Sequence, residues 1–159
     1  MYAAIRVRAL GPARLGQLVA DLAAAAGDWR HLVRFEQERR WYHRLYSADD
    51  HEAWLLSWLP GQETGFHDHG DAAGAFAVAD GELQERAAAV GRPGIRSREI
   101  PAGRFRAFGS RHVHDVRNVS AGPAVSIHAY SPPLSAMRRY EMTSTGLVLV
   151  TVESAERDW

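Results

Sequence analysis

The first third of the chain has the hydrophobic spacing of an amphipathic helix. Apolar residues recur every three or four positions, at Leu15, Leu18, Val19 and Leu22, which predicts a helix with one apolar face. Pro12 suits its start, because proline has the φ value that the first helical turn needs. Gly27 predicts its end.

Asp28 is expected to cap a second short helix, since its side chain can accept from the free backbone N–H groups of the first turn. Trp29, Leu32 and Val33 would form the apolar face of that helix. We interpret both helices as a layer that packs against a sheet.

After about Arg40, short apolar runs divided by glycine, proline and aspartate replace the helical spacing. Such runs are typical of β-strands. The predicted strands are 54–59, 75–78, 124–128 and 147–150. Asp80-Gly81 predicts a hairpin turn, because glycine tolerates the positive φ of tight turns. Many short strands at close spacing predict a mainly β fold, a sandwich or a small barrel.

Composition narrows the functional classes. The chain has 159 residues, enough for one domain with its own core. Its 19 basic residues, all arginine, balance 19 acidic ones, so no charge excess points to a nucleic acid or an anionic membrane. No apolar run is long enough to span a membrane and no signal-peptide pattern is seen, so we expect a cytoplasmic protein. The chain contains no cysteine, which excludes disulfides, thiolate metal sites and a cysteine nucleophile.

Histidines carry the clearest chemical signal. His67 and His69 are two positions apart, so on a strand both side chains point the same way. A third imidazole from His112 or His114 would complete a three-nitrogen face with open positions for a substrate. Imidazole suits iron, copper, zinc and nickel, and a zinc hydrolase with three histidines fits the same ligands.

A second group of polar residues alternates along one predicted strand. Ser126, His128 and Tyr130 can therefore share one face as a hydrogen-bonded row. On these residues alone, a buried strand whose polar groups satisfy one another explains the pattern equally well.

Glycine and histidine spacing resembles the first motif of the cupin superfamily, from Gly61 through His67-Asp68-His69 to Gly81, with Gly74 where cupins usually have glutamate. His114 and Asn118 match the end of the second motif. More specifically, the stretch from about 40 to 140 resembles the cysteine dioxygenase family. The matching segments are Arg40-Trp41-Tyr42-His43-Arg44-Leu45, Trp58, Asn118-Val119-Ser120 and Pro123-Ala124-Val125-Ser126-Ile127-His128-Ala129-Tyr130-Ser131-Pro132-Pro133.

This resemblance implies a cupin-type small β-barrel, jelly-roll-like, with short N-terminal helices. It would form a single domain over 1–159, with a helical part at about 12–40 and a barrel at about 41–153. The implied metal is one Fe(II) per chain, with ligands His67, His69 and His114. His112 is expected to be a polar strand residue near the rim, and His31, His43 and His51 ordinary surface or interface residues.

The resemblance also implies roles around the metal. Ser126, His128 and Tyr130 would be catalytic, with the tyrosine hydroxyl near substrate and oxygen. The implied substrate-binding residues are Arg44, Tyr42 and Trp58, with Arg44 as the carboxylate ligand. The Ser131-Pro132 peptide bond is expected to be cis. Because Gly74 occupies the position of the family's cross-linking cysteine, no cysteine–tyrosine cross-link can form.

The implied reaction adds both atoms of O2 to the sulfur of L-cysteine, giving cysteine sulfinate. Relatives acting on 3-mercaptopropionate carry glutamine at the arginine position, and Gln62 lies too close to His67 to be that glutamine. The alternatives are another small thiol such as 3-mercaptopropionate, or a cupin that holds metal or ligand without turnover. The expected partners are a small thiol and O2, with no nucleic acid and no membrane. The chain is expected to be a monomer or a weak homo-oligomer.

Overall fold

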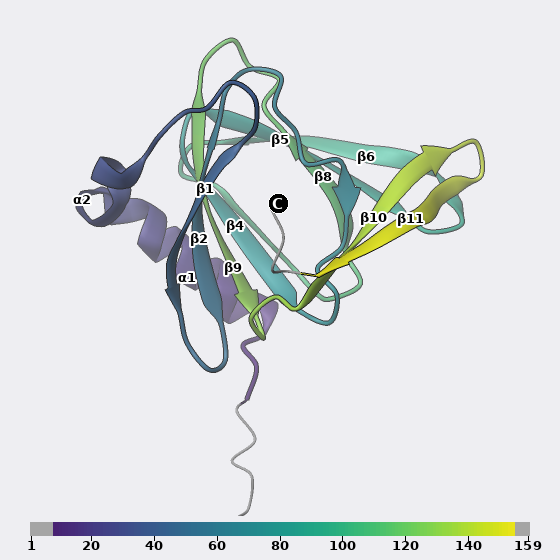
Figure 1. The fold of residues 1–159 in the computed structure, drawn as a ribbon, viewed down its shortest axis with the longest axis horizontal. Helices are drawn as coiled ribbons and strands as arrows, with labels where there is room; N and C mark the ends of the chain where they lie inside the picture. Colours follow the sequence, from purple (N-terminus) through teal and green to yellow (C-terminus); the bar gives the residue numbers. More distant parts are fainter. Residues whose placement is uncertain (1–7, 155–159) are drawn as a thin grey trace, which may run out of the picture.

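The computed structural model describes residues 8–154, which form two antiparallel sheets that face each other (Figure 1). The first sheet has, in spatial order, β1 (Trp41–Ser47), β2 (Glu52–Trp58), β9 (Ala124–Ser131), β4 (Ala73–Asp80) and β7 (Phe105–Phe108). The second sheet has β11 (Gly146–Ser154), β10 (Ala136–Thr143), β3 (Phe66–His67), β8 (Val113–Arg117), β5 (Glu82–Ala89) and β6 (Arg92–Pro101).

Side-chain alternation divides the first sheet into two apolar faces. The inward face carries large residues such as Leu56, Trp58 and Phe76, which pack with Leu83 of the second sheet. The outward face carries small residues, among them Ala53, Ala75, Ala77 and Ala129. Because residues two apart share a face, this alternation decides which side chains reach the space between the sheets.

Helix α1 (Pro12–Ala24) packs against the outward face of the first sheet, as Figure 1 shows. Its Leu15 and Val19 are fully buried there. Alanines in the strands beneath let the helix approach closely. The predicted helical layer is therefore present, and it leaves the opposite face of the sheet free for the interior of the barrel.

The second helical segment differs from the prediction. Helix α1 ends at Ala24, and α2 (Ala26–Trp29) already contains Gly27 and Asp28, so Asp28 does not cap it. The 3-10 helix η1 (Arg30–Leu32) follows directly. Trp29 is buried as expected, and its indole donates to the carbonyl of Leu22. Burial of this ring, rather than a capping side chain, anchors the segment.

Gly81 makes a tight turn at φ 74°, but the predicted hairpin is wrong. Strand β4 pairs with β7 and β9, whereas β5 pairs with β6 and β8. The turn therefore carries the chain from one sheet to the other. A Cβ at Gly81 would lie 2.4 Å from the carbonyl oxygen of Pro123, so only glycine fits this crossing.

The predicted strands at 54–59, 75–78, 124–128 and 147–150 correspond to β2, β4, β9 and β11. None of the described helices has the length and apolar character needed to cross a membrane.

Candidate metal centre

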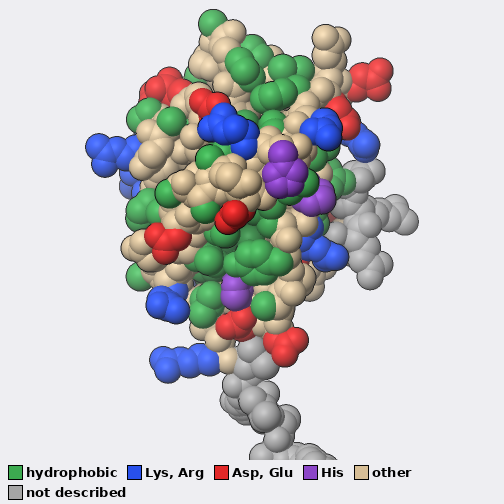
Figure 2. All heavy atoms as spheres, turned by 90° about the vertical axis from the view of Figure 1, so that its left-hand side faces the viewer, with side chains coloured by type: hydrophobic (Ala, Val, Ile, Leu, Met, Phe, Trp, Pro, Cys, Tyr) green, Lys and Arg blue, Asp and Glu red, His purple; other side chains and the backbone are tan. Residues whose placement is uncertain are grey.

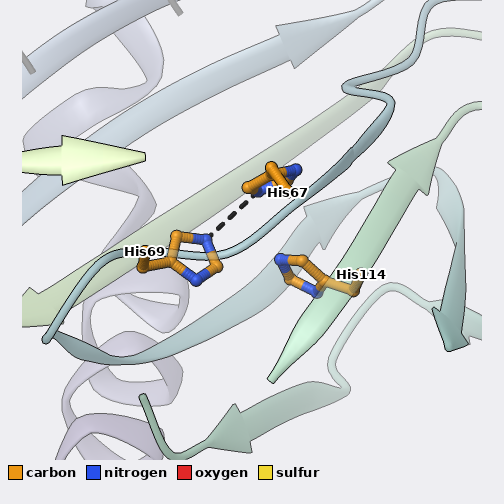
Figure 3. Close-up of side chains that lie close together, drawn as sticks. All are labelled: His67, His69 and His114. Carbon is orange, nitrogen blue, oxygen red and sulfur yellow. Dashed lines mark hydrogen bonds between the residues drawn. The ribbon is translucent and has the colours of Figure 1, made fainter. Parts of the chain in front are cut away.

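Three histidines converge in the interior of the barrel, between the two sheets (Figure 3). His67 ends β3 and lies directly opposite His114 of β8 in the antiparallel register. His69 follows in the turn after β3. Each of the three side chains is buried, with at most 3% of its surface exposed.

The nitrogen atoms of these imidazoles lie close enough to share one ion. One ring nitrogen from each lies within 4.8 Å of the others. The Nε2 atoms of His67 and His69 are 3.2 Å apart, and the ring centroids are separated by 4.8 to 5.1 Å. Figure 3 shows His114 facing this pair from the neighbouring strand.

Hydrogen bonds on the far side fix the orientation of two rings. His67 donates its Nδ1–H to the carbonyl oxygen of Gly65 at 2.9 Å, since a carbonyl can only accept. His114 donates its Nδ1–H to the carboxylate of Glu85 at 2.9 Å. With Nδ1 protonated, Nε2 of each neutral ring offers a lone pair to the centre, which is how proteins orient histidine ligands.

Burial keeps the three imidazoles neutral. Desolvation lowers the pKa of His67 and His69 well below the ordinary value, and it also lowers the pKa of His114. A positive charge on one ring would also be repelled by a charge on its neighbours, which lowers the pKa of His67 and His69 further. Because neutral imidazole is the metal-binding form, the donor set fits a divalent cation. Three nitrogen donors leave coordination positions for a substrate and a second ligand.

Glu85 of β5 is the hub of the hydrogen bonds behind His114. Its carboxylate also accepts from Nε2 of His112 at 2.9 Å and from Nε of Arg106 at 2.8 Å. Burial alone would raise the pKa of Glu85, but these hydrogen bonds hold it well below its usual range.

Glu85, His112 and His114 also form a second candidate metal cluster. We interpret it as a hydrogen-bonding unit, because its nitrogens already bond to the carboxylate. The structure places His112 just before β8, with its side chain 21% exposed.

Two other carboxylates beside the histidines hold loops. Asp68 accepts from the hydroxyl of Tyr140 at 2.9 Å and from Arg138. Asp115 accepts from Arg86 and from the backbone N–H of Gly65. Neither carboxylate is in the cluster of possible metal ligands. The central cluster of possible ligands therefore consists of three histidines without a carboxylate.

The polar row on β9 is present in the first sheet. Trp58 donates its Nε1–H to Ser126 at 2.9 Å, Ser126 lies 2.8 Å from Nε2 of His128, and Nδ1 of His128 lies 3.3 Å from the Tyr130 hydroxyl. The ring of Tyr130 stacks on His69 at 4.9 Å between centroids. Both Tyr130 and His128 line the cavity of the three histidines. Burial raises the pKa of Tyr130, so the phenol keeps its proton at neutral pH.

Phe108 fills the space beside Gly74. A Cβ at Gly74 would lie 2.6 Å from the Phe108 ring and 3.0 Å from the Tyr130 ring. Phe108 also stacks on His69, with centroids 5.1 Å apart. An apolar ring therefore packs where a cross-linking side chain would have to reach Tyr130. The Ser131-Pro132 peptide bond is cis, as predicted.

Arg44 lies apart from the residues that line the cavity. It is exposed on the edge strand β1, and its guanidinium lies over the indole of Trp54, 5.6 Å from the ring centroid. Trp54 is the cross-strand neighbour of both Arg44 and His128, so the strand that carries Trp54 separates them. Arg44 is not among the residues that line the cavity. Its position does not support the role of carboxylate ligand.

Arg40 occupies the cavity instead. Its side chain is buried, lines the cavity and lies over the ring of Trp58, 5.0 Å from the centroid. Desolvation, with repulsion from Arg139, lowers the pKa of Arg40 to about 10. The group therefore remains a cation at neutral pH. Tyr42 and Trp58, the other expected substrate residues, do not line the cavity; Trp58 supports Arg40 and Ser126 from behind.

Arg139 is a second cation that sequence reasoning missed. It lies opposite His67 in the register of β10 and β3 and lines the cavity with Thr64 and Met137. Its guanidinium donates to the carbonyl of Thr64 at 2.8 Å and to Glu153 at 3.1 Å. No acidic residue lines the described cavity. The interior therefore favours an anionic ligand.

The outer surface on the side of α1, α2 and β1 looks different. Figure 2 shows acidic and basic side chains scattered over this side among apolar ones, without a large patch of one sign. His31 and His43 are exposed, and His51 bonds to Asp50 and Tyr46. None of these three histidines joins the central cluster.

A closed pair of sheets with inward-facing histidines defines the class: a cupin with a candidate metal centre. The sequence model described as cysteine dioxygenase type I matches residues 12–143. The chain belongs to the cysteine dioxygenase type I family, as its motifs predicted. No curated protein matches it by sequence.

Solved structures support the fold. A Klebsiella pneumoniae protein with a double-stranded β-helix domain superimposes with a TM-score of 0.57 and 18% identity, covering 77% of this chain and 93% of its own. An RmlC-like cupin from Desulfovibrio desulfuricans gives 0.55 and 20%, covering 64% and 91%. A Thermus thermophilus protein gives 0.58 and 22%, covering 65% and 93%. The predicted cupin-type barrel is confirmed, and fold and family together support a cupin thiol dioxygenase.

Proposed function

We propose that this protein is an iron-dependent thiol dioxygenase that converts L-cysteine to cysteine sulfinate. The observation that carries the proposal is the content of one cavity: the imidazoles of His67 and His114, the hydroxyl of Tyr130 and the guanidinium of Arg40 all line it. His69 completes the metal-ligand set from the adjoining turn. Bound Fe(II) would supply the redox chemistry that joins O2 to sulfur.

Charge selects the substrate. Arg40 places a cation beside three neutral histidines, and no carboxylate among the lining residues offsets it, whereas Arg139 is paired with Glu153. The carboxylate of a thiol substrate would complement Arg40, and its thiolate would complement a bound dication. Arginine presents a planar fork that matches a carboxylate, and in this proposal Arg40 takes the role first assigned to Arg44. Stacking on Trp58 holds its guanidinium in place.

Tyr130 and His128 orient the reacting groups. The protonated phenol can donate to an oxygen atom beside the histidines, and His128 with Ser126 fixes its direction. The burial of the row excludes water. In the overall reaction, both atoms of O2 bond to sulfur, which is oxidised from thiolate to sulfinate, so no external reductant is required. The protein mainly contributes orientation and electrostatics.

The test is oxygen uptake by the iron-loaded protein with three thiols: L-cysteine, 3-mercaptopropionate and cysteamine. Sulfinate should form in equal amount to the oxygen consumed, with L-cysteine preferred and cysteamine poor, because cysteamine lacks the carboxylate. Preference for 3-mercaptopropionate would support the first alternative, a dioxygenase for another carboxylated thiol. Equal rates on cysteine and cysteamine would contradict carboxylate recognition. Bound iron without turnover of any thiol would support a cupin that only binds metal or ligand.

A further inference from the structure

A groove of about 700 Å³ lies at one end of the second sheet and shares no lining residue with the cavity of the three histidines. Its walls are the ends of β5 and β6 and the residues that lead into β8. Figure 1 shows this end of the β5–β6 hairpin beside the tip of the β10–β11 hairpin, and Val90 forms a bridge with Leu147 there. The volume is within the range of roughly 300–1,000 Å³ that small-molecule sites have.

The lining of this groove combines apolar surface with unpaired positive charge. Val90 and Ile95 are 58% and 40% exposed, and alanines of β5 continue the apolar floor. Three arginines, Arg92, Arg96 and Arg111, border it, and no acidic residue does. Among the described residues, none of these three guanidinium groups is within ion-pair distance of a carboxylate.

The groove also reaches the hydrogen bonds behind the metal centre. His112 lines it. The same ring bonds to Glu85 at 2.9 Å, and Glu85 bonds to His114 at 2.9 Å. A ligand in the groove would therefore touch a residue two hydrogen bonds away from a candidate metal ligand.

We propose that this groove binds a small organic anion with an apolar body, a medium-chain carboxylate. Charge complementarity carries the choice: the arginines supply cations that no residue of the lining neutralises, and the exposed apolar floor suits a hydrocarbon chain. An uncharged amphiphile would provide no negative charge to neutralise the arginines. A polar anion such as phosphate would leave the apolar side chains of Val90 and Ile95 exposed to water. This site is separate from the thiol cavity, and binding to it does not require metal.

The experiment is calorimetric titration of the full-length, metal-free protein with octanoate, and with octanol as the uncharged probe. Octanoate should bind saturably with one site per chain, and octanol at least tenfold more weakly. Arg96→Gln and Arg111→Gln should each weaken octanoate binding about tenfold. Arg98→Gln is the matched control, because Arg98 lies on the same strand but outside the groove; it should change the affinity less than twofold.

A second measurement locates the ligand. Octanoate should shift the ring signal of His112 in a histidine NMR spectrum, assigned by its loss in His112→Gln. Absence of saturable binding, equal affinity for octanol, or an Arg98→Gln effect as large as that of Arg96→Gln would each overturn the proposal. Because no metal or thiol is present, these results are independent of whether the thiol dioxygenase proposal holds.

Discussion

Arg139 lies directly opposite His67 in the antiparallel register of β10 and β3. His114 lies opposite His67 on its other side. Directly opposed residues share a face of the sheet, so the register of three strands alone lines up a cation and two candidate ligands. Strand pairing thus places the positive charge of Arg139 beside the cavity. The residues next to His67 in the sequence do not predict this charge.

Arg40 and Arg44 give opposite predictions when each is replaced by glutamine. Losing a charge-assisted contact to a carboxylate costs about 1.5–3 kcal/mol, which is roughly ten- to a hundred-fold in kcat/KM. Arg40→Gln should show this loss in steady-state oxygen uptake with cysteine, while keeping its iron. Arg44→Gln should stay within about twofold of the parent protein. The reverse ranking would restore Arg44 as the carboxylate ligand and remove Arg40 from the proposal.

Glu85→Gln should weaken metal binding without unfolding the protein. The carboxylate fixes the ring of His114 and raises its basicity, and loss of such a partner typically costs 10- to 100-fold in metal affinity. Competition with a chelator measures this change. Glu99→Gln is the control, because the exposed carboxylate of Glu99 accepts a hydrogen bond from Gln84 on the neighbouring strand and is not part of the histidine cluster. Equal affinities of the two variants would show that Glu85 does not act through His114.

Tyr130→Phe should retain iron and cysteine binding but lower turnover. The variant keeps the ring that stacks on His69 and loses only the hydroxyl that lies near His128. We also expect a larger share of the oxygen to be consumed without forming sulfinate. Parallel measurement of oxygen uptake and sulfinate checks both points. Rate and coupling equal to those of the parent protein would mean that the tyrosine is structural.

The metal-free protein should lose stability as the pH falls below about 7. Desolvation lowers the pKa of His67, His69, His114 and His128, whereas in the unfolded chain they titrate near pH 6.5. Their contribution is therefore present above pH 6.5 and is lost on acidification, because the unfolded state then binds more protons. The free energy of unfolding should fall by at most about 1.4 kcal/mol per pH unit for each histidine.

Urea unfolding between pH 7.5 and 5.5 measures this slope. His128→Gln removes one of the four titrating groups and should make the slope shallower. A free energy of unfolding that does not change over this interval would contradict the prediction.

The sequence pattern was sufficient for β2, β4, β9 and β11 and for the polar row on β9, because alternation and apolar runs are local properties, but it did not define the other described strands. Partners of strands are not local. Asp80-Gly81 has the chemistry of a hairpin turn, yet the strands that it joins belong to different sheets. Because the chain crosses to the second sheet at this turn, Glu85 lies behind His114 on the neighbouring strand. The local sequence pattern could not predict this position.

The two arginines show the same limit. Arg40 directly precedes β1 and Arg44 lies within it, four residues later, yet only Arg40 lines the cavity, whereas Arg44 is exposed over the indole of Trp54. Arg139 reaches the cavity through its pairing with His67. The pairing of His67 with His69 was predictable from their spacing, and the family resemblance selected His114 over His112. The charged groups around them depend on which strands become neighbours.

The candidate metal ligands belong to the second sheet and its following turn, whereas Ser126, His128 and Tyr130 belong to the first. Each set is held by hydrogen bonds on its own side, and the two sets meet where the ring of Tyr130 stacks on His69. Phe108 and Phe76 pack beside this contact: Phe108 stacks on His69, and Phe76 stacks on His128. Changing the size of either ring would therefore move the phenol of Tyr130 relative to the imidazoles. The size of the apolar side chains in the core therefore sets the distance between the groups that would take part in the reaction.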